Sequence, residues 1–242
     1  LIGVTNFFRD REAFEALERD IIPALFEGKT DAEDKSLRIW SAACSTGEEA
    51  YSLAMLFADQ AQLSSPDNEL HIQLFATDID DRSLETARAG VYPEAIITDV
   101  PPSRLRQYFF KEQNHYRMQK ELRERILFAR HNILRDPPFS RLDLISCRNL
   151  MIYLDRDIQV EVLRMFHFAL NPGGYLFLGS SETADACSQL FEPVDKKNRI
   201  YRAKNVGSGL RRAPPGPFQP LTEGSLGRAP LSQPPRRHRK FS

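Results

Sequence analysis

Apolar and polar positions along the first 204 residues follow two different periods. Short apolar runs indicate β-strands, and stretches with apolar residues three or four positions apart indicate helices between them. The predicted strands cover 37–40, 70–77, 116–119, 126–129, 142–146, 175–179, 190–193 and 199–203. The predicted helices cover 11–25, 50–62, 82–89, 101–109 and 158–170, and Pro23 should kink or end the first of them. Strands that alternate with helices indicate an α/β fold, and the last two strands should form a hairpin.

The stretch from Ile39 to Glu49 joins a strand to a helix through a turn of small residues. Small side chains let a ligand approach the backbone, and the start of a helix offers free N–H groups. The turn holds one glycine, Gly47, and the acidic pair Glu48 and Glu49 follows at once. This composition argues against a pyrophosphate and favours a ligand with a positive group, such as S-adenosylmethionine (SAM). The alternative is an ordinary turn between a strand and a helix.

Polar residues also stand at the ends of two further predicted strands. Asp78 ends one of them, where nucleoside-binding α/β domains hold ribose hydroxyls with a carboxylate. Asp80 is the second candidate for that role, and its alternative role is to cap the helix that follows. Asn149 and Tyr153 follow the strand at 142–146, at the sheet edge where open α/β sheets bind ligands.

The neutral overall charge hides two parts of opposite sign. Residues 205–242 hold seven of the 33 Lys and Arg residues and a single acid, so the first 204 residues carry a net charge of −6. The tail is rich in proline and glycine and lacks an apolar period, which predicts a disordered linker. Contact of its basic residues with nucleic acid or an anionic membrane is the alternative.

Three cysteines, with neither paired nor metal-like spacing, indicate reduced thiols, a cytoplasmic location and no metal site. The sequence has no signal peptide and no apolar run near 18 residues, so we expect no membrane insertion. It opens on Leu1 rather than Met and ends in the predicted linker, which favours a segment of a larger protein.

Five motifs occur in an order and spacing that closely resemble those of the CheR family, the chemoreceptor glutamate O-methyltransferases. They are TNFFR at 5–9, WSAACSTGEEAYS at 40–52, ATDID at 76–80, ARAGVY at 87–92 and CRNLMIY at 147–153. The resemblance covers nearly all of residues 1–204 and implies one class I SAM-dependent methyltransferase domain. This Rossmann-like fold has a mostly parallel seven-stranded sheet with a closing hairpin, and a small inserted β-subdomain is expected at about 109–131.

The resemblance also assigns a cofactor site. Thr5 and Arg9 match the pair at the methionine end of SAM, and Ala43 and Glu49 match the groups that take its amino group. Asp78 matches the ribose ligand, in agreement with its place after a strand.

Two further parts of the cofactor have matches later in the chain. Asn132 and Ile133 match the contacts near the adenine. Asn149, Leu150 and Tyr153 match the wall of the methyl-donor pocket.

The reaction that the resemblance implies depends on positioning more than on acid–base chemistry. A glutamate side chain has an ordinary pKa of about 4.3, so the nucleophile is ionised near neutral pH without a general base. We therefore assign Arg9 to orienting the substrate carboxylate and Tyr153 to shaping the methyl pocket. The alternative for Arg9 is a surface ion pair with Asp10 or Glu12.

Two departures from the family pattern limit what is carried over. Gly3 stands where the family has an asparagine contact, so that contact is not assigned. The stretch Lys111–Arg125 is shorter than in members that dock a receptor's C-terminal pentapeptide, and it lacks their glycine-containing turn. Pentapeptide tethering is therefore not expected.

The resemblance thus predicts methyl transfer from SAM to glutamates of chemoreceptors or related signalling proteins, with S-adenosylhomocysteine (SAH) as the second product. The segment DKKNRIYR at 195–202 looks closest to fused proteins that join CheB and CheR modules to PAS and kinase domains. In such a protein the alternative is a SAM-binding sensory or docking module with little turnover. A dinucleotide oxidoreductase is disfavoured by the missing glycines, and no specific nucleic-acid partner is expected.

Overall fold

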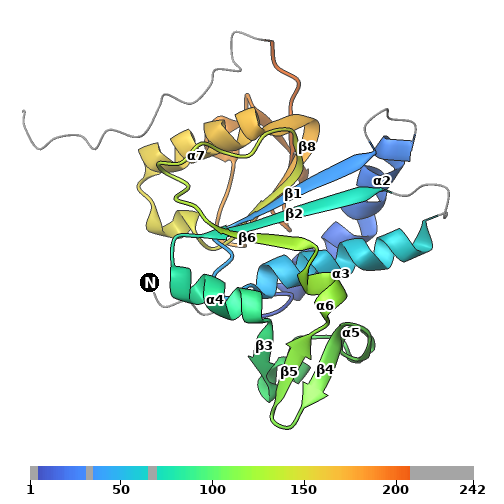
Figure 1. Cartoon of the computed structure of the whole chain (residues 1–242). Coiled ribbons are helices and arrows are strands. Elements are labelled where there is room, and N and C mark those ends of the chain that lie inside the picture. The colour runs from blue at the N-terminus through green and yellow to red at the C-terminus, as the bar shows by residue number, and fades with distance from the viewer. Residues whose placement is uncertain (1–4, 31–34, 65–69, 208–242) are drawn as a thin grey trace, which may run out of the picture.

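The computed structural model describes residues 5–30, 35–64 and 70–207 (Figure 1). Most of the tail predicted as a linker, from residue 208 onward, lies outside the described residues. The described elements, in chain order, are α1 Arg11–Ala16, η1 Leu17–Ile21, α2 Ile22–Thr30, β1 Ser36–Ala42, α3 Glu48–Leu63, β2 His71–Asp78, α4 Asp81–Ala89, β3 Val91–Pro93, η2 Glu94–Thr98, α5 Pro102–Tyr108, β4 Phe109–Glu112, β5 His115–Met118, α6 Lys120–Arg123, β6 Ile126–Arg130, β7 Leu142–Cys147, η3 Met151–Tyr153, α7 Arg156–Ala169, β8 Leu170–Leu178, η4 Asp185–Cys187, β9 Phe191–Asp195 and β10 Ile200–Ala203.

The main sheet of the described chain has seven strands in the order β6-β2-β1-β7-β8-β10-β9. The first five are parallel neighbours, and β10 runs antiparallel to both β8 and β9. Helices cover both faces, with α7 on one and α3 and α4 on the other (Figure 1), as a largely parallel sheet requires. The predicted fold class, a mostly parallel seven-stranded sheet with a closing hairpin, is confirmed.

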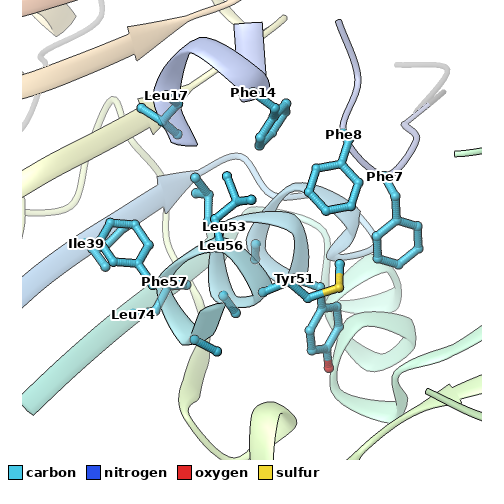
Figure 2. Packing of buried hydrophobic residues seen from close by; sticks show 14 of the residues in the cluster. Phe7, Phe8, Phe14, Leu17, Ile39, Tyr51, Leu53, Leu56, Phe57 and Leu74 are labelled. Carbon is cyan, nitrogen blue, oxygen red and sulfur yellow. The ribbon is translucent and has the colours of Figure 1, made fainter. Parts of the chain in front are cut away.

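The central strand β1 sends successive side chains into two separate cores, as the period of two dictates. Leu37 and Ile39 are fully buried in the core that contains α3. Trp40 and Ala42 are buried in the core that contains α7. Figure 2 shows the first core, where side chains of α3 pack between those of the strands and of the N-terminal helices. Burial on both faces fixes β1, and thereby fixes the start of the turn that follows it.

The N-terminal helical region does not end at Pro23, so that part of the prediction is wrong. α1 continues through the π-helical segment η1 into α2, where Pro23 is the second residue. The N–H of Ile22 bonds to the carbonyl of Leu17, the long step of a π-turn. A proline inside a continuous helix removes one N–H from the ladder, and a π-turn is one of the local irregularities that accompany such an interruption.

A second sheet of three strands, in the order β3-β5-β4, stands apart from the main sheet (Figure 1). It begins at Val91, earlier than the insert expected at about 109–131, whereas β6 within that range pairs with β2 as the edge strand of the main sheet. The ring of Phe7 packs edge-on against Tyr92 and Phe109, with centroids 4.8 and 5.6 Å apart. The N-terminal segment is thereby attached to the small sheet.

Candidate functional site

A cavity of about 560 Å³ opens at the carboxyl ends of β1, β2 and β7. From the N-terminal segment and the turn after β1 it is lined by the predicted residues Thr5, Arg9, Ala43 and Glu49. From the ends of β2 and β7 it is lined by the predicted residues Asp78, Asn149, Leu150 and Tyr153. A larger cavity, of about 960 Å³, lies beside β2 and contains none of these residues. The fold therefore brings eight of the ten predicted site residues to one place.

The turn after β1 differs from an ordinary connection in its backbone. Ala43 and Ser45 have positive φ angles, 59° and 48°, a conformation that costs free energy in residues other than glycine. Gly47 also has a positive φ, and a Cβ there would lie 2.9 Å from the Cβ of Ala87. Two bonds offset this strain, because the N–H of Cys44 donates to Thr77 and that of Ser45 donates to the Asp78 carboxylate. The turn is thus held against β2 at the cavity.

The two acids after the turn, Glu48 and Glu49, point to different surroundings. Glu49 lines the cavity and accepts a hydrogen bond of 2.8 Å from the Ser41 hydroxyl. Burial raises the pKa of Glu49, and the charge of Arg148 and nearby serine hydroxyls limit that rise. Glu48 instead accepts a hydrogen bond from the Thr46 hydroxyl and does not line the cavity. Glu49 is therefore the carboxylate that a ligand in this cavity meets.

The two aspartates after β2 have different roles. One oxygen of Asp78 accepts from the Ser45 N–H at 2.8 Å and the other from the Asp80 N–H at 3.0 Å. Each carboxylate oxygen retains acceptor capacity for a ligand hydroxyl. Asp80 caps α4 by accepting from the N–H groups of Arg82 and Ser83. The capping role predicted for Asp80 is confirmed, and it leaves Asp78 as the better candidate for a diol.

Arg9 lies on a segment that is anchored on both sides. Phe8 is buried and its N–H donates to the Ser52 hydroxyl of α3 at 2.9 Å. Asp10 pairs with Arg148 at 2.7 Å, while Glu12 pairs with Lys197 at 2.6 Å. The two acids considered as surface partners of Arg9 are thus engaged by other cations. Arg9 itself is exposed and lines the cavity.

The loop after β7 is held by a buried carboxylate. Glu182 is 4% exposed and accepts backbone hydrogen bonds from Asn149, Met151 and Gly179 at 2.7–3.0 Å. Asn149 has a positive φ of 60°, so its conformation depends on such support. A Cβ on Gly179 would lie 2.8 Å from the Asn149 nitrogen, which leaves no room for a larger residue. These contacts set Asn149 and the following residues along the cavity.

Tyr153 stands at the cavity mouth, on η3. Tyr153 is 59% exposed. The neighbouring Ile152 is 48% exposed, and Ile79, from the loop after β2, is 51% exposed. All three line the cavity. The mouth therefore presents an aromatic and two aliphatic side chains beside the cationic Arg9.

Asn132 and Ile133 follow β6 and do not line the cavity. The Asn132 side-chain oxygen accepts from the Leu134 N–H, and its own N–H donates to Asp136. The preceding N–H, of His131, donates to the carbonyl of Asp78 at 2.9 Å, so this loop adjoins the site. Their contact with an adenine stays a prediction.

The charged and polar side chains that line the cavity suit a ligand with several charged and polar groups. Glu49 offers an anion for an ammonium, Asp78 acceptors for a diol, and Arg9 donors for a carboxylate. SAM carries the ammonium and the diol, and a carboxylate is present both in SAM and in a substrate glutamate, so the residues fit the expected cofactor. Within the described residues, no group of three or more His, Cys, Asp or Glu could hold a metal ion. A helix long and apolar enough to cross a membrane is likewise absent from the described part of the chain.

Comparison with known proteins assigns the chain to a family. The family described as "CheR methyltransferase, SAM binding domain" matches residues 3–200. The chain is 35% identical over 211 residues to "Putative methyltransferase Cher3" of Pseudomonas putida, and 34% identical over 204 residues to "Chemotaxis protein methyltransferase 1" of Pseudomonas aeruginosa. Each match covers 83% of this chain and 73% of the relative. The chain belongs to the CheR methyltransferase family, and SAM is its methyl donor.

A third relative is much longer than the chain. An uncharacterized 104.1 kDa protein of Rhodobacter capsulatus is 40% identical over 235 residues, which are 97% of this chain. The chain spans only 23% of the length of that relative.

Two residues that hold the site together, Arg148 and Glu182, are not among those assigned from the sequence. Arg148 lines the cavity and stands inside the CRNLMIY motif, yet neither its burial nor its partner Asp10 can be read from that motif. Glu182 lies outside all five motifs and acts through backbone contacts to a loop 33 residues earlier. Both are charged residues that closely follow a predicted strand, 142–146 for Arg148 and 175–179 for Glu182, and this position is the signal that they share.

Proposed function

We propose that this chain transfers the methyl group of SAM to side-chain carboxylates of glutamates in chemoreceptors or related signalling proteins. The products are glutamate methyl esters and SAH. One observation carries the proposal, the gathering of Arg9, Glu49, Asp78 and Tyr153 around a single cavity at the carboxyl ends of the parallel strands. Membership in the CheR family, and chemotaxis methyltransferases among the relatives, support the substrate class.

The cofactor-binding residues divide the cavity between them. Glu49 takes the amino group of SAM, and Asp78 takes its ribose hydroxyls. Thr5 and Ala43 contact the methionine end, and Asn149 and Leu150 form the wall beside the donor. When bound, SAM supplies an electrophilic methyl group attached to a positively charged sulfur.

The reacting end lies at the mouth, beside Arg9 and Tyr153. Arg9 donates hydrogen bonds to the incoming carboxylate and orients it, while Tyr153 and its aliphatic neighbours limit the access of water. The carboxylate is ionised near neutral pH, so none of these residues has to remove a proton. Holding both reactants in place supplies on the order of 7–11 kcal/mol in well-oriented systems.

The Rhodobacter capsulatus relative favours a place in a multidomain protein. Because the chain spans 23% of that 104.1 kDa protein, we infer that it is one module of a longer chain. The resemblance of residues 195–202 to fused proteins supports CheB, PAS and kinase neighbours. In that setting a SAM-binding sensory or docking module with little turnover is the second candidate function. Its location is the cytoplasm in either version, which suits the three free and buried cysteines.

A methyl-transfer assay separates the two functions. The chain is incubated with SAM labelled in the methyl group and with the cytoplasmic domain of a chemoreceptor, and SAH binding is measured by calorimetry. Protein-bound label that alkali releases as methanol identifies a methyl ester and supports the enzyme. SAH binding without transfer supports the binding module instead.

Arg9→Ala tests the division of roles. We expect turnover to fall by about 100-fold or more while the SAH dissociation constant changes little, because Arg9 acts mainly on the substrate carboxylate. Equal losses in turnover and in SAH affinity would show that Arg9 serves the cofactor alone. Arg11→Ala is the matched control, since Arg11 is exposed, pairs with Glu15 and does not line the cavity.

A further inference from the structure

Arg148 is a buried arginine at the end of β7. Its side chain is 2% exposed and lines the cavity. The guanidinium lies over the rings of Phe14 and Phe177, 5.0 and 4.6 Å from their centroids, and its Nε donates to the Leu178 carbonyl. Burial of a permanent charge is costly unless the charge is paired, so its partners show what it does.

One partner of Arg148 is the segment that carries Arg9. A guanidinium N–H donates to the Asp10 carboxylate at 2.7 Å across 138 residues of sequence. Asp10 and Phe8 both have positive φ angles, 59° and 50°, so this segment needs outside contacts to keep its conformation. The Asp10 ion pair holds one side of Arg9, and the bond from Phe8 to Ser52 holds the other.

Arg148 also shares the cavity lining with Glu49, so its buried charge acts on that carboxylate across the cavity. Burial raises the pKa of Glu49, and the charge of Arg148 is the strongest influence that lowers it again. Glu182 opposes the ionisation of Glu49, and Arg9 is exposed to solvent, which screens its charge. Asp78, Asp80 and Tyr153 also line this cavity, and Glu48 adjoins Glu49 in the chain. The thiols of Cys44 and Cys147 lie close to Glu49 as well, and burial keeps them neutral.

We propose that Arg148 is a positioning residue with two roles at the methyl-donor site. It fixes the Arg9 segment (residues 8–10) against the cavity through Asp10, and it supplies a buried positive charge in the cavity where Glu49 meets the amino group of the cofactor. The first role rests on the proposed function. The second concerns cofactor binding alone.

The pH dependence of SAH binding tests the second role. Ionised Glu49 is the form that accepts an ammonium, so SAH affinity should be lost as the pH falls through the pKa of Glu49. Arg148→Met removes the positive charge that favours ionised Glu49. The pH at which SAH affinity is lost should therefore rise by about one to three units. Arg148→Lys keeps the charge and should bind SAH with a pH profile close to that of the unmodified chain.

Glu49→Gln is the control for these profiles, because it should bind SAH weakly and without this pH step. The step should also be missing when Glu49→Gln is combined with Arg148→Met. An Arg148→Met profile that coincides with that of the unmodified chain overturns the electrostatic role.

Asp10→Asn tests the first role and leaves the charge of Arg148 in place. We expect turnover with the chemoreceptor domain to fall by about tenfold or more, while the SAH pH step stays where it is. Glu12→Gln is the matched control, since it neutralises an exposed acid two residues away that pairs with Lys197. Equal turnover in Asp10→Asn and Glu12→Gln overturns the proposal that Arg148 fixes the Arg9 segment through Asp10.

Failure of the proposed function can be told apart from failure of the role proposed for Arg148. A chain that binds SAH without methyl transfer refutes the proposed function, and the SAH profiles then decide the role of Arg148. Thermal melting shows whether Arg148→Met folds. If it does not fold, Asp10→Asn still tests whether Arg148 fixes the Arg9 segment, because Asp10 is partly exposed and its replacement is mild.

Discussion

Replacement of Glu182 gives the sharpest prediction on the architecture of the site. Glu182 is 4% exposed, and its carboxylate accepts hydrogen bonds from the backbone N–H groups of Asn149, Met151 and Gly179. In Glu182→Ala all three donors lose their acceptor. A buried donor without a partner costs about 1–3 kcal/mol, so the upper bound for three is roughly 9 kcal/mol. Water that enters from the cavity satisfies part of this demand, and we expect a loss of about 3–5 kcal/mol in the free energy of unfolding.

Glu182→Gln should be less damaging for a geometric reason. One oxygen of Glu182 accepts from both Asn149 and Gly179, and the other accepts from Met151. A glutamine whose oxygen takes the place nearest Asn149 and Gly179 keeps those two bonds. Its NH₂ group then faces the N–H of Met151, which loses its acceptor. The expected loss is about 1–3 kcal/mol, the cost of one unsatisfied donor.

Urea unfolding and SAH calorimetry measure both variants. SAH affinity should fall in the order of the stability losses, because the same loop carries Asn149 along the cavity wall. Glu192→Ala is the control, since Glu192 pairs with Arg202 at the surface and should change stability by less than about 0.5 kcal/mol. Equal stability of Glu182→Ala and Glu182→Gln would refute the argument from counted donors.

Three further predictions test other parts of the molecule. Gly179→Ala should reduce SAH affinity and lower stability by about 1–3 kcal/mol, because its Cβ would collide with the Asn149 nitrogen; calorimetry and thermal melting check this. Phe7→Ala should cost about 3–5 kcal/mol in urea unfolding through lost contacts with Tyr92 and Phe109, and a loss below 1 kcal/mol would contradict that anchoring. Burial raises the pKa of all three cysteine thiols, so at pH 8 Ellman's reagent should react only after unfolding; fast reaction of the native chain would contradict the burial.

The parts of the site that could be predicted are those governed by strand ends. Parallel strands bring their carboxyl ends to one edge of a sheet, so Asp78 and Asn149 could be placed together from local pattern alone. The small-residue turn and Glu49 follow from the same rule. Arg9 depended on the family motif, because nothing in a local pattern brings residue 9 to that edge.

The parts that could not be predicted depend on contacts between distant segments. Arg148 meets Asp10 across 138 residues, and the backbone N–H of Asn149 meets Glu182 across 33. The strand at 126–130 has the same local pattern whether it joins the small or the main sheet, and its pairing with β2 decides the matter. The predicted helix end at Pro23 is wrong because the π-turn that carries the helix past this residue is set by packing rather than by residue type.

The attachment of the N-terminal segment has a consequence for the order in which the molecule folds. Phe7 packs against Tyr92 and Phe109, and Asp10 forms its ion pair with Arg148. Contacts of such long sequence separation close late, because chain closure costs entropy before any contact repays it. Residues 5–10 leave the ribosome before their partners, so they are among the last described residues to reach their native places. The central sheet can therefore form while the reacting end of the site is still incomplete, and methyl transfer becomes possible only with the final docking step.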